Sequence, residues 1–168
     1  MKRKHVFYSY GYLLNAAQHA NVRLKNGGEP LTESLNTILH CALALEAYLN
    51  HVGAGAMPCW TPLKKKLSPN EKVEVLAAHL GIPVDWGKMP YQSLAKAFAF
   101  RNLIVHAETE TVELPVADTR SAEAKWQAYC KPKIADRVLA DTWRFIKEFK
   151  GPDAVRQIPS FILAERTR

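Results

Sequence analysis

The stretch from residue 31 to residue 52 limits most strongly what this chain can fold into. Its apolar residues recur at three- and four-residue steps, as on one side of an α-helix, and further apolar residues widen that side. The stripe comprises Leu31, Leu35, Ile38, Leu39, Ala42, Leu45, Leu49 and Val52, and it is broadened by Leu43, Ala44 and Ala47. An apolar surface this wide needs covering on two sides. We therefore expect a central helix packed among others.

Four more segments have helical periodicity, at 5–26, 68–80, 91–107 and 133–149. Ser68-Pro69-Asn70-Glu71 has the pattern of a capping box with proline at the first helical position, and Gly81 marks the end of that helix. Residues 91–107 are apolar nearly all round, as in a helix that is covered on more than one side. We also expect a short helical turn after Thr61-Pro62 and helical turns within 122–130, whereas 109–115 could be extended or loop.

Together these segments predict an all-α fold, an antiparallel four- to five-helix bundle. A length of 168 residues favours a single domain, which we place at residues 1–150. The tail at 151–168 contains Ile158, Phe161, Ile162 and Leu163, so we expect part of it to pack on the bundle.

The chain is basic, with 23 Lys and Arg against 16 Asp and Glu and a formal net charge of +7. A basic balance favours anionic partners such as RNA, DNA, nucleotides or an acidic protein. No stretch approaches the roughly 18 apolar residues of a membrane span. We therefore expect no membrane partner.

The three cysteines, Cys41, Cys59 and Cys130, are odd in number and widely spaced. They form no disulfide framework and suit a reducing compartment, so we expect a cytoplasmic protein. His40 and His51 stand near two of them, but the spacing matches no common zinc pattern. We predict no metal site.

Arg101, Asn102 and His106 form a polar group in the apolar segment 91–107. Asn102 and His106 are four residues apart and share a helix face, and Arg101 lies about 140° round from His106. A buried charge costs several kcal/mol unless it is paired, so Arg101 needs a partner or a cleft. A purely structural capping and salt-bridge cluster at a helix end is the alternative, because a cation is favoured there.

The pattern Arg101-Asn102-x-x-x-His106 resembles the motif of the HEPN superfamily. That motif is an arginine, often followed by a polar residue, and then a histidine after four to six intervening residues. The segment at 43–50, Glu71-Lys72-Val73 and Phe100 next to the motif are similar to further parts of the family. The resemblance covers roughly residues 5–150.

The resemblance implies a HEPN-like bundle that acts as a metal-independent endoribonuclease without a cofactor. HEPN ribonucleases usually form homodimers in which two motifs line one cleft. The ribose 2′-hydroxyl attacks the adjacent phosphate, which leaves a 2′,3′-cyclic phosphate and a 5′-hydroxyl. Such proteins commonly serve in toxin–antitoxin or phage-defence systems, so an antitoxin partner protein is also implied.

The three residue types suit this chemistry. His106 can exchange a proton near neutral pH. Arg101 presents a planar fork of donors to a phosphate, and it could stabilise charge in the transition state. Asn102 could orient His106 or bind a phosphate oxygen. The sequence leaves the acid and base roles unassigned. Glu46 and Asn50, four apart on the central helix, are either supports for this site or a buried pair that joins helices.

Six further basic residues are candidates for holding an RNA backbone. They are Lys64, Lys65, Lys66, Lys131, Lys133 and Arg137. A solvated charge run is the alternative for the three consecutive lysines.

Two other functions stay open at this point. One is a non-catalytic HEPN domain that binds RNA, a nucleotide or a partner protein, because fold does not fix function. The other is a structural dimerisation bundle, in which His106→Ala would leave every function untouched. The RNA target, the cleavage specificity and the pathway cannot be read from the sequence.

Overall fold

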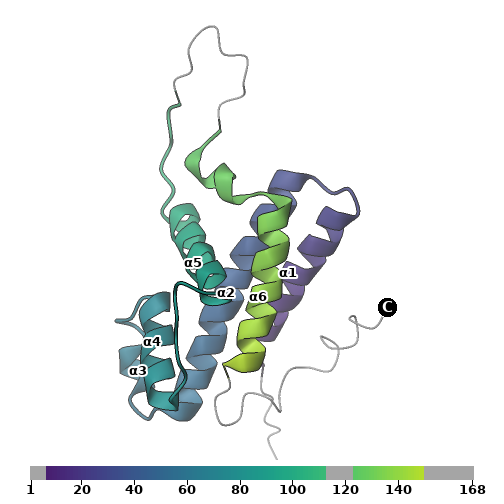
Figure 1. Cartoon of the computed structure of the whole chain (residues 1–168). Coiled ribbons are helices and arrows are strands. Elements are labelled where there is room, and N and C mark those ends of the chain that lie inside the picture. The colour runs from purple at the N-terminus through teal and green to yellow at the C-terminus, as the bar shows by residue number, and fades with distance from the viewer. Residues whose placement is uncertain (1–6, 113–122, 150–168) are drawn as a thin grey trace, which may run out of the picture.

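The computed structural model describes residues 7–112 and 123–149 (Figure 1). These residues form six α-helices and one 3₁₀ helix and contain no strand, which confirms the all-α prediction. The elements are α1 (Ser9–Lys25), α2 (Pro30–Ala56), α3 (Trp60–Leu63), α4 (Pro69–Leu80), α5 (Tyr91–Val105), η1 (Lys125–Tyr129) and α6 (Pro132–Glu148). Figure 1 shows the long helices α1, α2, α5 and α6 side by side, with α3 and α4 at one end.

Helix α2 is the centre of the fold and contacts α1, α3, α4, α5 and α6. The predicted central helix is therefore confirmed, although it runs further than 31–52 at both ends. It continues through Gly53 because a glycine costs a helix only about 1 kcal/mol. This glycine is buried, and a Cβ atom there would lie 2.2 Å from the ring of Trp60. The bare backbone thus lets α3 pack closely on α2.

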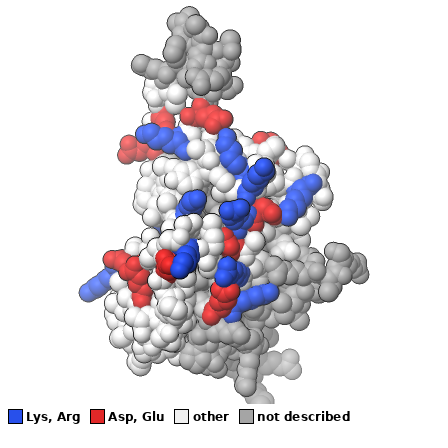
Figure 2. All heavy atoms as spheres, in the orientation of Figure 1, with Lys and Arg blue, Asp and Glu red and all other residues white. Residues whose placement is uncertain are grey.

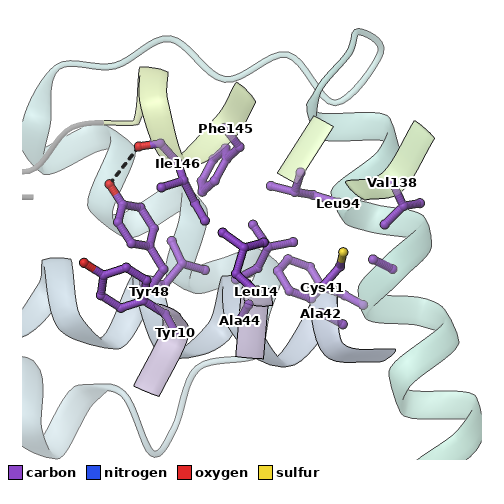
Figure 3. Close-up of a cluster of buried hydrophobic side chains, with 14 of the residues drawn as sticks. Tyr10, Leu14, Cys41, Ala42, Ala44, Tyr48, Leu94, Val138, Phe145 and Ile146 are labelled. Carbon is purple, nitrogen blue, oxygen red and sulfur yellow. Dashed lines mark hydrogen bonds between the residues drawn. The ribbon is translucent and has the colours of Figure 1, made fainter. Parts of the chain in front are cut away.

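The hydrophobic core lies between α1, α2, α5 and α6 and extends to α3 and α4. Figure 3 shows part of it. Leu45 and Tyr48 of α2 are fully buried in it. The Tyr48 hydroxyl donates to the carbonyl oxygens of Phe149, at 2.7 Å, and Ile146, at 3.2 Å. These two bonds attach the end of α6 to α2, and they satisfy a polar group that would be costly to bury alone.

The structure confirms most of the helix ends that local sequence signals predict. The Ser68 hydroxyl accepts from the backbone of Glu71 and the Glu71 carboxylate accepts from the backbone of Ser68, so the capping box is confirmed. Gly81 ends α4 with a φ of 68°, a conformation that suits glycine. Helix α5 ends at Val105, two residues before the predicted end. The short turn predicted after Thr61-Pro62 lies slightly earlier, as α3, which includes both residues. The turns predicted within 122–130 are η1.

Residues 109–112, where extended structure or loop was left open, belong to no helix or strand. The predicted packing of the tail at 151–168 falls outside the described residues. Among the helices that are described, none is long and apolar enough to cross a membrane.

Candidate functional site

Arg101 projects from the last third of α5 toward α2. Its Nη2 atom lies 3.4 Å from Oε2 of Glu46, and its Nη1 atom donates to Oδ1 of Asn102 at 2.9 Å. The Arg101 side chain keeps 27% of its surface exposed. Its Nε atom is buried, and it has no hydrogen-bond partner within the part of the chain that is described. The arginine is thus anchored by one carboxylate and one amide, and it still reaches solvent.

Glu46 is shared between two cations. Its other oxygen, Oε1, accepts from Nζ of Lys72 at 2.6 Å, and the Lys72 side chain is only 4% exposed. One carboxylate on α2 therefore links α4 to α5. Because one negative charge faces two positive ones, the group keeps a net positive charge at the position of Arg101. The prediction that Glu46 supports the motif is consistent with this contact. The alternative reading, a buried pair that joins helices, is equally consistent with it.

Lys72 is the member of this group that sequence reasoning missed. It lies four residues before Leu76 on α4, so it falls on the apolar face of that helix. A lysine on an apolar face is the signal that could have revealed it, because lysine is almost never fully buried unless it is paired.

His106 lies at the end of α5, and its side chain is exposed. Its backbone N–H donates to the carbonyl oxygen of Asn102 at 3.1 Å, which continues the helix by one residue. Within residues 7–112 and 123–149, no hydrogen bond or ion pair joins Arg101 to His106. The two ends of the motif therefore have different surroundings. Arg101 is held by Glu46 and Asn102, whereas the side chain of His106 is exposed to solvent.

His106 lines a pocket of about 710 Å³ beyond the end of α5. Three carboxylate residues also line it, Glu108, Glu110 and Glu123, together with Lys125. Glu110 accepts from the backbone of Lys125 at 3.2 Å, and Glu123 lies 3.5 Å from the ammonium of Lys131. These carboxylates make the His106 side of the site less favourable for a polyanion than the Arg101 side.

Asn50 lies one turn after Glu46 on α2. Its Oδ1 atom is buried and has no hydrogen-bond partner among the described residues. It lines a second pocket, between α2 and the start of α1, rather than contacting Arg101. The structure thus connects Glu46 directly to the motif and does not connect Asn50 to it.

The predicted RNA-binding residues fall into two groups on different elements. Lys65 and Lys66 are exposed after α3, and Lys64 is half-buried there. Lys131, Lys133 and Arg137 are exposed at the start of α6. On the face shown in Figure 2, Lys and Arg are interspersed with Asp and Glu. The described residues on that face therefore form no patch of a single sign.

The three cysteines have different surroundings. Cys41 and Cys130 are buried and Cys59 is exposed, all as free thiols. Burial raises the pKa of the Cys41 thiol to about 12 and that of Cys130 to about 11. Across the described ranges, no three His, Cys, Asp or Glu residues gather as metal ligands would.

Comparisons of the chain with protein-family models, with curated proteins and with solved structures find no match. The resemblance to the HEPN superfamily therefore depends on the Arg101-to-His106 motif and on the helices that surround it.

Proposed function

We propose that this chain is a metal-independent endoribonuclease of the HEPN type, with Arg101, Asn102 and His106 at its active site. The observation that carries the proposal is the arrangement at the end of α5. An arginine is anchored by Glu46 while still reaching solvent, and an exposed histidine follows five residues later. An arginine needed only for stability could be fully enclosed by its partners.

The chemistry proceeds without a covalent intermediate on the protein. The ribose 2′-oxygen attacks the adjacent phosphorus, and the bond from phosphorus to the 5′-oxygen breaks. A base takes the 2′-hydroxyl proton and an acid donates a proton to the 5′-oxygen. His106 can perform either transfer, and Arg101 can neutralise the charge that builds on the phosphate oxygens. The products are a 2′,3′-cyclic phosphate and a 5′-hydroxyl.

A homodimer completes this proposal. Val105 and Val112, on either side of His106 in the sequence, keep 56% and 41% of their surface exposed. Val105 ends α5 and Val112 lies in the segment that follows it, and contact with a second copy would cover exposed apolar side chains such as these. Two copies joined there would bring two His106 side chains to one RNA, so that one could act as acid and the other as base.

RNA and an antitoxin-type partner protein in the cytoplasm belong to the same proposal. The net charge of +7 supports binding of a polyanion. We expect the backbone to approach from the Arg101 side, because Glu108, Glu110 and Glu123 surround His106.

The test is cleavage of total RNA and transfer RNA by purified protein in EDTA. We expect cleavage with cyclic phosphate ends, and a loss of at least about 100-fold in His106→Ala. His19→Ala is the matched control, since His19 is an exposed histidine on α1, outside the motif. Equal cleavage by the wild type and His106→Ala would contradict the proposed site.

A second candidate function is a non-catalytic HEPN-type domain that binds a partner protein. The carboxylates beside His106 favour it, because they suit a basic protein surface better than RNA. Failure of the wild type to cleave any RNA, together with tight binding of a basic partner, would favour this function.

A further inference from the structure

Lys72 is the one charged residue that is buried among those the structure describes, and the proposed reaction does not use it. It keeps 3% of its surface exposed, and Val73 and Leu76 are buried on the same helix. Burial of an ammonium costs several kcal/mol unless it is paired. A buried ion pair often adds no stability over apolar side chains of similar volume. Packing alone therefore gives little reason for a lysine at this position.

Lys72 belongs to a group of three charges that three helices bring together. Lys72 lies on α4, Glu46 on α2 and Arg101 on α5, and each of these helices contacts the other two. The Lys72 ammonium donates to Oε1 of Glu46 at 2.6 Å, whereas Nη2 of Arg101 lies 3.4 Å from Oε2. The lysine therefore makes the short, charge-assisted hydrogen bond, and the arginine makes a longer contact.

These unequal distances affect how strongly Arg101 can attract an anion. An arginine that pairs with a carboxylate is frequently held through two parallel hydrogen bonds. Glu46 makes no such pair with Arg101, because its Oε1 atom is bound to Lys72. Two cations and one carboxylate leave one net positive charge, and the Lys72 side chain is only 4% exposed. The Arg101 side chain is 27% exposed, so the positive charge is available to a ligand there.

We propose that Lys72 is a positioning residue that sets the anion affinity of Arg101 through Glu46. Without the ammonium, Glu46 would have Arg101 as its sole cationic partner among the described residues. It would then pair fully with the arginine and neutralise it. With Lys72 in place, Glu46 orients the arginine and leaves its charge free. This inference rests on the proposed function in one respect, which is that the anion at Arg101 is an RNA phosphate.

The alternative is that Lys72 only ties α4 to α2. A tie of this kind needs a donor to Glu46 but no charge. Lys72→Gln is the variant that separates the two roles, because its amide can donate to a carboxylate and is neutral. The inference predicts that Lys72→Gln weakens anion binding as much as Lys72→Met does.

The test measures binding of a short, single-stranded 2′-O-methyl RNA to the full chain by fluorescence anisotropy. This RNA keeps its phosphates and has no free 2′-hydroxyl, so it cannot undergo the proposed attack. We expect Lys72→Met to weaken its binding about tenfold. Lys88→Met is the matched control, because it removes the same charge from an exposed pair with Asp85. The control should change binding less than about twofold.

Two double variants show whether Lys72 acts through the other two charges. Glu46→Gln together with Lys72→Met removes one charge of each sign and should bind within about twofold of the wild type. A merely structural role does not predict that rescue. Arg101→Gln together with Lys72→Met should bind as weakly as Arg101→Gln alone, because the effect of Lys72 requires the arginine.

Folding is checked by the thermal midpoint of each variant. Lys72→Met should stay folded, because Glu46 keeps Arg101 as a partner and is 22% exposed. The inference would be overturned by absence of wild-type binding, by equal binding of Lys72→Met and the wild type, or by failure of Glu46→Gln to restore binding. RNA cleavage alongside any of these results would leave the proposed function standing. Binding that depends on Lys72 without any RNA cleavage would support the inference and contradict the nuclease, so the two proposals can fail separately.

Discussion

The two sides of helix α2 differ in how deeply they are buried and in the kinds of contact that they make. The inner side, with Cys41, Leu45 and Tyr48, is fully buried against α1, α5 and α6. The outer side, with Leu43 and Glu46, is only half-buried. On the inner side almost every contact is apolar. The outer side holds a shared carboxylate and, at Asn50, an oxygen that has no partner among the described residues.

Within this one helix, the inner side provides most of the stability, and the outer side carries the polar groups. Packing on the inner side fixes α2 without help from the polar residues, because apolar burial contributes roughly 25 cal/mol per Å² whatever the opposite side carries. The outer side can then hold groups that are not fully satisfied. Such groups cost stability.

The largest expected effect is on the inner side. Leu45→Ala should lower the free energy of unfolding by about 3 to 4 kcal/mol, because Leu45 is fully buried and its loss leaves a cavity. Leu43→Ala, a leucine on the outer side of the same helix, should cost less than about 1 kcal/mol. Equilibrium urea unfolding measures both. Equal losses would show that the two sides do not differ as described.

Glu46→Ala should be the largest effect on the outer side, at about 3 kcal/mol. Removal of the carboxylate leaves the Lys72 ammonium buried without a described counter-charge, and removal of one partner of a buried pair is strongly destabilising. Glu148→Ala breaks an exposed pair with Arg144 and should change the urea midpoint by no measurable amount. An unchanged midpoint in Glu46→Ala would mean that Lys72 reaches water.

Gly53→Ala should cost about 2 kcal/mol by forcing Trp60 away from α2, since the new Cβ atom would lie 2.2 Å from its ring. Gly55→Ala is the matched control on the same helix, because no atom of the described residues lies within 4 Å of its added Cβ. It should leave the stability unchanged or raise it by up to about 1 kcal/mol. Thermal unfolding of the two variants tests how closely α3 packs.

A pH dependence of the inner side should appear only above neutral pH. Burial raises the folded pKa of Cys41 to about 12, above its ordinary value of 9.0. Its contribution to stability is therefore fully present below about pH 9 and is lost as pH rises toward 12. Cys41→Ala should remove this slope, measured by urea unfolding between pH 9.5 and 11.5.

Cys59→Ala is the control for that slope, because Cys59 is exposed. It should lose stability with pH as steeply as the wild type. Cys130 and the buried tyrosines titrate in the same direction, so the test is the difference in slope between Cys41→Ala and Cys59→Ala. Identical slopes would contradict the burial of Cys41.

Most of the helices could be predicted because their signals are local. Apolar periodicity identified α2, and the Ser68 capping box and Gly81 fixed both ends of α4. Helix ends that lack such signals were predicted less accurately. Helix α2 runs past Val52, its predicted end, because the helix tolerates Gly53, and the missing side chain there lets Trp60 pack closely.

The candidate site could be predicted only in part. The spacing of Arg101 and His106 is visible in the sequence, and Glu46 was a candidate because it interrupts an apolar helix. Lys72 was not anticipated. Its partner comes from a helix far away in the chain, and no local pattern specifies which residues meet.

The sequence by itself determined which segments are helical and which carry charge, because helix periodicity, caps and charge are properties of neighbouring residues. Only the tertiary structure decided that one carboxylate on α2 serves both Lys72 and Arg101. The physical reason is that apolar faces specify that helices pack but not their rotation and offset. Those two quantities decide which side chains come within bonding distance.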